Sequence, residues 1–247
     1  MRKSPVAGIR LGLGSLVALM LASSSPALAA AADIGTTVVV VRTVTGTLET
    51  QVRRLVIHDN VAQNELIATA PDAASEIQFI DGTKLSLGPR AHVVLDKFVY
   101  DPNPSKGKFF LRVSEGVFRF ATGHMAHQSY QIMTPNGTLG VRGTEFNLVV
   151  FRDRTIVQIL EGTVFGTSSD GIPRSFNRGA YFTMTHSTGP SSSNDKSVIN
   201  TQVALMDSLL GGKQFAGGPP PRNEGTHPFQ QLFHPVPKPQ SVSPTLP

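Results

Sequence analysis

Apolar and polar residues alternate in short runs along most of the chain. In Glu76–Phe79, Ile77 and Phe79 occupy every second position, and Leu85 and Leu87 continue this pattern after the dipeptide Asp81-Gly82. A period of two is typical of strands with one buried face, and Asp-Gly favours a tight turn between strands. Because convincing helical periodicity is missing between residues 36 and 188, the sequence predicts an all-β domain over that range.

Two short patterns occur twice, and both times in the same order. Gly82-Thr83 is echoed by Gly143-Thr144, and Glu115-Gly116 is echoed by Glu161-Gly162. Gly suits the backbone of a corner, and Thr favours the strand that follows it. The spacing between the copies is not uniform. We therefore predict a degenerate repeat whose Gly elements are corners, in a β-solenoid-like or flattened β-sandwich domain.

The pattern changes beyond residue 189. Apolar residues recur at helical spacing between residues 198 and 210, after the candidate N-caps Ser193, Asn194 and Asp195 and before Gly211-Gly212. This arrangement predicts a short amphipathic helix over residues 195–210. Two roles are open for it, as a cap packed on the end of the β domain or as a partner-binding or marginally ordered helix. Residues 217–247 are Pro-rich and lack apolar periodicity, which predicts a disordered tail.

Residues 1–29 have the features of a secretory signal peptide. A basic start and a short apolar segment precede Ala27-Leu28-Ala29, which fits a small-x-small cleavage site. Three of the 22 Lys and Arg residues leave with this segment, and none of the 17 acidic residues does, so the net charge falls from +5 to near +2. No cluster of basic and aromatic residues follows, which argues against nucleic-acid binding.

Cysteine is absent from the chain, so disulfides, thiolate metal sites and a thiol nucleophile are excluded. No apolar run after the predicted signal peptide is long enough to span a bilayer, which takes about 20 residues. The sequence therefore predicts an exported bacterial protein, periplasmic or extracellular, that does not span the membrane.

Candidate catalytic residues are few. Glu115 and Glu161 are the best carboxylate pair for glycoside chemistry, but each precedes a Gly at a turn, where a polar residue usually accepts backbone hydrogen bonds. His124-Met125-Ala126-His127 has the spacing of metal ligands without a nearby third ligand. Arg142 is a candidate anion contact, or a residue that holds its own turn. These residues predict no catalytic, cofactor-binding or metal site.

The ordered set of motifs resembles the FecR-like periplasmic domain family. The resemblance rests on Thr69–Pro89, on Glu115–Phe120 and Thr134-Pro135, and on Gly140–Phe146 and Glu161–Val164, in that order, and it covers roughly residues 40–168. It implies an all-β, largely solenoid-like domain in the bacterial periplasm. The best-known members of the family relay transporter occupancy to a cytoplasmic sigma factor through an anti-sigma segment and a transmembrane helix, and we expect neither of these in this protein.

We therefore expect a non-enzymatic, exported FecR-like protein that needs no cofactor and binds a protein partner in the cell envelope, in envelope sensing or signalling. An exposed terminal turn of a solenoid offers unpaired edge groups, and strand addition there is a natural way for such a domain to bind. The alternative is a structural or carbohydrate-binding module of the envelope. Asp81 and Glu145, which lie beside the Gly-Thr elements, are expected to serve the turns rather than a ligand.

Overall fold

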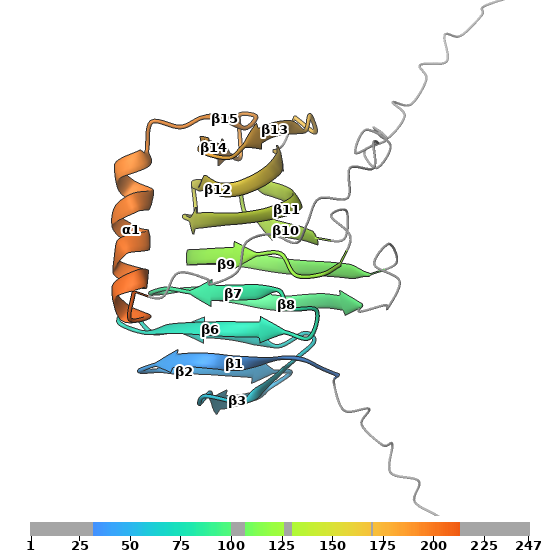
Figure 1. The fold of residues 1–247 in the computed structure, drawn as a ribbon, viewed down its shortest axis with the longest axis vertical. Coiled ribbons are helices and arrows are strands. Elements are labelled where there is room, and N and C mark those ends of the chain that lie inside the picture. The colour runs from blue at the N-terminus through green and yellow to red at the C-terminus, as the bar shows by residue number, and fades with distance from the viewer. Residues whose placement is uncertain (1–31, 100–106, 126–129, 169, 213–247) are drawn as a thin grey trace, which may run out of the picture. The chain divides into compact units, whose positions relative to one another are not determined.

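Strands dominate the described part of the chain, which comprises residues 32–99, 107–125, 130–168 and 170–212 of the computed structural model (Figure 1). The predicted signal peptide (1–29) and the predicted tail (217–247) lie outside these residues. The prediction of an all-β domain is confirmed. In chain order the elements are β1 (Asp33–Val41), β2 (Val44–Leu48), β3 (Gln51–Arg54), β4 (Asn60–Ala62), β5 (Leu66–Thr69), β6 (Ala74–Phe79), β7 (Lys84–Leu87), β8 (His92–Val99), β9 (Lys108–Ala121), β10 (Tyr130–Thr134), β11 (Gly137–Val150), β12 (Arg154–Thr167), β13 (Arg174–Asn177), β14 (Tyr181–Thr185), β15 (Ser191–Ser192) and α1 (Lys196–Leu209).

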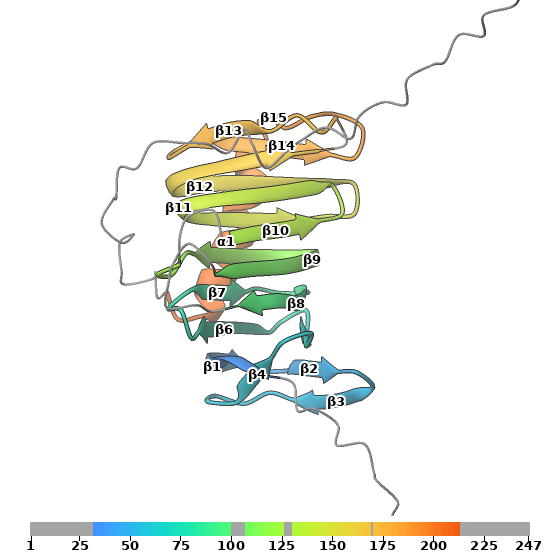
Figure 2. The ribbon, with the colours of Figure 1, turned by 90° about the vertical axis from the view of Figure 1, so that its right-hand side faces the viewer.

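The strands form one hydrogen-bonded network that folds into two facing sheets. The helix-side sheet runs in the order β4, β1, β6, β7, β9, β11, β12, β14, β15. The far sheet runs in the order β3, β2, β5, β8, β9, β10, β11, β12, β13. Each of the long strands β9, β11 and β12 has one half of its length in one sheet and the other half in the other sheet. The strands stack from β3 at one end to β13 and β15 at the other (Figure 2).

The long strands pass from one sheet to the other at glycines. Gly116, Gly143 and Gly162 have φ angles of 116°, 55° and 76°, which residues with a Cβ atom rarely adopt. The register between β11 and β12 shifts at this point, between Arg142 and Glu145. A Cβ atom on Gly162 would lie 2.1 Å from the carbonyl oxygen of Gly143, so the two corners need glycine for space as well. The repeated Gly-Thr and Glu-Gly elements are therefore corners.

The core lies between the two sheets and is filled from both. Six aromatic rings with centroid distances of 4.8 to 6.1 Å run through it in a connected chain, and most of the contacts are edge-to-face or tilted. Each such pair contributes roughly 0.5–1.5 kcal/mol beyond the area it buries. The rings belong to Phe79, Phe98, Phe109, Phe120, Tyr130 and Phe146. Phe79 belongs to the alternating pattern from which the strands were predicted.

Helix α1 lies across the strands on the outer face of the helix-side sheet (Figure 1). Its buried residues Ile199, Val203 and Met206 pack against apolar side chains that point outward from four strands, namely Ala74, Val117, Val149 and Ile156. Asp195 stands at the N-cap without a side-chain capping bond, and the helix ends before Gly211, whose φ is 77°. The helix thus covers one face of the domain rather than the end of the stack.

Candidate functional site

Asp81, which begins the first Gly-Thr element, is buried in a network of hydrogen bonds. Its side chain accepts bonds from the amide and the hydroxyl of Thr83, at 3.0 and 2.6 Å, and from the phenol of Tyr130, at 2.8 Å. Burial, and then the charge of Asp81, raise the pKa of Tyr130 well above its ordinary value. With 1 % of its surface exposed, Asp81 holds the corner together and offers nothing to a ligand.

The carboxylate pair Glu115 and Glu161 is not brought together. Glu161 pairs with Glu145, and Glu145 pairs with Ala121 on β9. Glu115 lies six residues before Ala121 on β9, so it is about 20 Å away along this strand at the rise of a strand. Glycosidase carboxylates are at most roughly 9.5 Å apart. Strand pairing therefore separates the two residues that the sequence offered for glycoside chemistry.

The other candidates are divided between the surface and the core. Arg142 is exposed just before the corner of β11. The Nδ1 atom of His124 lies 2.7 Å from the carbonyl oxygen of Asp81, so this ring is engaged with the corner. His127 lies outside the described residues. Within the described ranges no group of three His, Cys, Asp or Glu side chains is placed to hold a metal ion.

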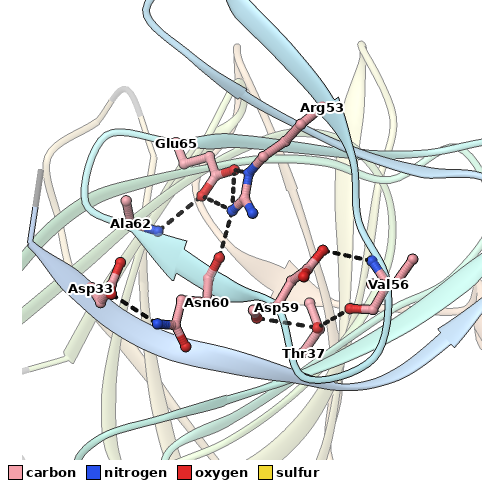
Figure 3. A network of polar contacts seen from close by, with 8 residues as sticks. All are labelled: Asp33, Thr37, Arg53, Val56, Asp59, Asn60, Ala62 and Glu65. Carbon is pink, nitrogen blue, oxygen red and sulfur yellow. Dashed lines mark hydrogen bonds and ion pairs between the residues drawn. The ribbon is translucent and has the colours of Figure 1, made fainter.

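Strand β3 forms one end of the far sheet, and an ion pair between Arg53 and Glu65 anchors it (Figure 3). The guanidinium of Arg53 donates to both carboxylate oxygens of Glu65, at 3.0 and 3.2 Å, and Glu65 also accepts the amide of Ala62 at 2.9 Å. Glu65 is 1 % exposed. A Cβ atom on Gly46 would lie 2.0 Å from Glu65 Oε1, which explains the glycine in β2. The end strand is thus fixed in place.

All four residues of β3 are exposed, and β3 pairs only with β2 among the described strands. Leu55 donates its amide to the carbonyl of Val44, so the hydrogen-bonded positions along this pair include Arg53 and Gln51. The amides and carbonyls of Val52 and Arg54 therefore point away from β2. Val52, Val56 and Ile57 are 67 %, 56 % and 49 % exposed. We call β3 with Val56 and Ile57 the β3 edge.

The opposite end of the far sheet, at β13, is less accessible than the β3 edge. Strand β13 pairs with β12 on one side, and its residues alternate between half-buried and exposed. The chain around Gly189 crosses close to it, because a Cβ atom there would lie within 2.3 Å of the side chains of both Arg174 and Asp170. Ile172 is the exposed large apolar residue of this region. The two ends of the stack are therefore not equivalent.

No local pattern in Gln51–Ile57 identifies this stretch as a free edge. An apolar residue at an alternating position is expected to be buried, and Val52 is instead turned outward at an edge. No local pattern distinguishes the two cases, because they differ in whether a distant part of the chain covers a face of the strand.

Comparisons with known proteins agree with the motif order. Residues 65–165 match the family model described as FecR protein. No curated protein matches the chain. Two crystal structures of a candidate anti-sigma factor from Parabacteroides distasonis are similar, with 13 % and 15 % identity and TM-scores of 0.42 and 0.43. Each alignment covers 54 % of this chain and 62 % of that one, so it spans less than two thirds of the known protein.

Among the described residues, no helix has the length and the apolar character needed to cross a membrane. The matched region begins at Glu65, in the loop before β5, and ends at Phe165 in β12. It contains all four glycine elements on which the resemblance was based, at Gly82, Gly116, Gly143 and Gly162. The chain therefore carries a FecR domain over residues 65–165.

Proposed function

We propose that this protein is a non-enzymatic FecR-domain protein that binds a protein partner of the bacterial cell envelope through the β3 edge. The observation that carries the proposal is the combination of unpaired backbone groups at Val52 and Arg54 with three exposed apolar side chains beside them. Free strand edges are templates for another strand, and monomers usually protect them. The β3 edge is anchored through Arg53 and Glu65, is exposed, and carries three apolar side chains, which suits strand addition.

The charges at this edge indicate what kind of segment fits. Arg53 is neutralised by Glu65, and Arg42 pairs with Asp72, whereas Arg54 donates only to the carbonyl of Arg42 within the described residues. One positive charge is thus left beside Val52. A second copy of β3 would bring like charges together, which destabilises a strand pair. The partner we propose is an extended segment with an apolar residue opposite Val52 and an acidic residue near Arg54.

The FecR domain supports a role related to envelope signalling. The predicted signal peptide over residues 1–29 supports export to the periplasm. A non-enzymatic role is favoured by the separation of Glu115 from Glu161. We propose that the protein contributes a binding surface to an envelope sensing pathway.

Site-specific photocrosslinking in cells tests the partner. A photoreactive amino acid at position 52 or 57 should crosslink to one envelope protein, and the same group at position 172, at the other end of the stack, should not. The captured protein is then purified and its affinity measured. We expect Val52→Lys combined with Ile57→Lys to weaken binding by at least tenfold, because both apolar contact and strand pairing are disturbed.

Ile172→Lys is the matched control, since it also replaces an exposed isoleucine with lysine. It should leave the affinity unchanged. The proposal is wrong if positions 52 and 57 give the same crosslinks as position 172, or if the double variant binds the purified partner as tightly as the wild type does.

A further inference from the structure

A cleft of about 390 Å³ lies between α1 and the helix-side sheet, beside the corners of β11 and β12. Pockets for small molecules have volumes of roughly 300–1,000 Å³, so this cleft is at the small end of that range. It lies away from the β3 edge, because none of its lining residues belongs to β1–β5. The lining residues are Arg119, Glu145, Asn147, Gln158, Leu160, Glu161, Asn200, Val203, Ala204 and Asp207.

The floor of the cleft is a continuous chain of polar side chains. Arg119, which is 4 % exposed, donates to the side chain of Asn147 at 2.9 Å and forms an ion pair with Asp207 of α1 at 2.8 Å. The chain then passes through the side chains of Gln158 and Tyr181 to Asn200, also on α1. Both ends of this series of hydrogen bonds are on α1, at Asp207 and Asn200, so it fixes the side chains that form the floor of the cleft. Its members are largely satisfied by one another.

Glu145 and Glu161 at the rim are not satisfied in this way. They face each other as paired residues of β11 and β12. The partner of Glu161 is Arg178, at 3.1 Å, and the Arg178 side chain is 72 % exposed, which makes a weak ion pair. Glu145 makes no hydrogen bond or ion pair with the described part of the chain. The cleft therefore contains acceptor capacity that the protein does not use.

The electrostatic setting of Glu145 agrees with this geometry. Burial raises its pKa above the ordinary value; Arg119 and Lys84 oppose the shift, and Glu161 and Asp207 add to it. A half-buried carboxylate that lacks a bonded partner gains from a cation placed against it. Next to the two carboxylates, Leu160, Val203 and Ala204 supply an apolar wall. The described residues contain no group of three ligands for a metal ion.

We propose that this cleft binds a primary aliphatic amine. The ammonium group lies between the carboxylates of Glu145 and Glu161, and the alkyl chain lies along Leu160, Val203 and Ala204. The amine has two sources with the same chemistry, a free alkylamine or the side chain of a lysine in a peptide. The proposal does not depend on the β3 edge, because the two surfaces share no residue.

Titration of the ¹⁵N-labelled full chain with n-butylammonium chloride tests the proposal by NMR. We expect saturable shifts of the backbone amides of Glu145, Leu160, Glu161 and Ala204. The neutral isostere n-butanol should give none. Glu145→Gln and Glu161→Gln should each weaken binding by about tenfold, the loss expected for one charge-assisted hydrogen bond. A tripeptide with a central lysine separates the two sources, since a site for lysine side chains binds it more tightly than butylammonium. The same tripeptide with an acetylated Nε, which lacks the charge, should not bind.

Glu115→Gln is the matched control, because it removes an exposed carboxylate of β9 that does not line the cleft. It should leave the affinity unchanged. Ala204→Leu fills the cleft from an exposed helical position without changing any charge, and it should abolish binding even if the glutamine variants fail to fold. The proposal is overturned if no saturable shift occurs, if n-butanol shifts the same amides, or if Glu115→Gln weakens binding as much as Glu161→Gln.

Discussion

Asp81 shows how one residue sets the conformation of a corner. Its carboxylate accepts three hydrogen bonds, while Thr83 Oγ1 accepts the amide of Gly123 at 3.0 Å. The corner between β6 and β7 is thereby tied to the chain that follows β9. The Asp-Gly-Thr order is needed because Gly82 has a φ of 83° and Thr83 supplies both a donor and an acceptor. The chemistry of this motif is therefore structural.

At this scale we predict that Asp81→Ala lowers the free energy of unfolding by at least about 3 kcal/mol, because several buried donors lose their acceptor at roughly 1–3 kcal/mol each. Tyr130→Phe should cost less, about 1–2 kcal/mol, because Asp81 keeps both bonds from Thr83. Urea denaturation of both variants measures the difference. Equal stability of Asp81→Ala and the wild type would show that the network does not hold the corner.

Helix α1 and the helix-side sheet depend on each other. The apolar stripe of the helix covers Val117, Val149 and Ile156, which point outward from their strands. Arg119 connects the same face to Asp207. Of the two roles left open by the sequence, the helix packs on the β domain, but it covers the face of a sheet and does not cap the end of the domain. Polar side chains under the helix form the floor of the cleft. Helix α1 therefore has a structural role and also borders a candidate site.

Neighbouring residues of α1 provide a matched test of this packing. Met206 is fully buried, and Leu205 is 47 % exposed. We predict that Met206→Ala lowers the free energy of unfolding by about 2–5 kcal/mol, through lost burial and the cavity left behind. Leu205→Ala should change it by less than about 0.5 kcal/mol. Urea unfolding followed by circular dichroism measures both. Equal effects of the two changes would mean that the helix is not docked as described.

At the scale of the whole domain, one continuous core connects the two ends of the stack. The cluster between the sheets extends from Ile34 in β1 to Met184 in β14. In a solenoid whose repeats contact only their neighbours, stability is a sum of local terms, and the ends can unfold separately. The long strands that cross between the sheets favour a single cooperative unit instead.

We therefore predict that the domain unfolds in a single transition, whichever end of the stack carries a destabilising substitution. Ile67→Ala and Met184→Ala, both at fully buried positions, should each lower the free energy of unfolding by about 2–5 kcal/mol. Far-ultraviolet circular dichroism and tyrosine fluorescence should report the same midpoint for each variant, as a two-state protein requires. Two separate midpoints in either variant would contradict the single unit and indicate independent modules.

Local residue patterns were sufficient to predict several features of this protein. Alternation of apolar residues predicted the strands, and the Gly-Thr and Glu-Gly pairs predicted the corners and the family. These features depend on residues that are close in the chain, because backbone preference and side-chain period are local properties. Glycine at a corner has the same requirement wherever the strands lead afterwards.

Only the tertiary structure decided which residues meet. Glu161 lies opposite Glu145 rather than near Glu115 because β11 pairs with β12 in a register that no local pattern specifies. The backbone of Val52 is free because β3 has no second neighbour among the described strands, and its side chain is exposed because neither face of β3 is covered. The cleft exists because α1 crosses strands far from it in the chain. Strand pairing and edge position are set by contacts between distant segments, so the candidate binding surfaces could be located only in the folded domain.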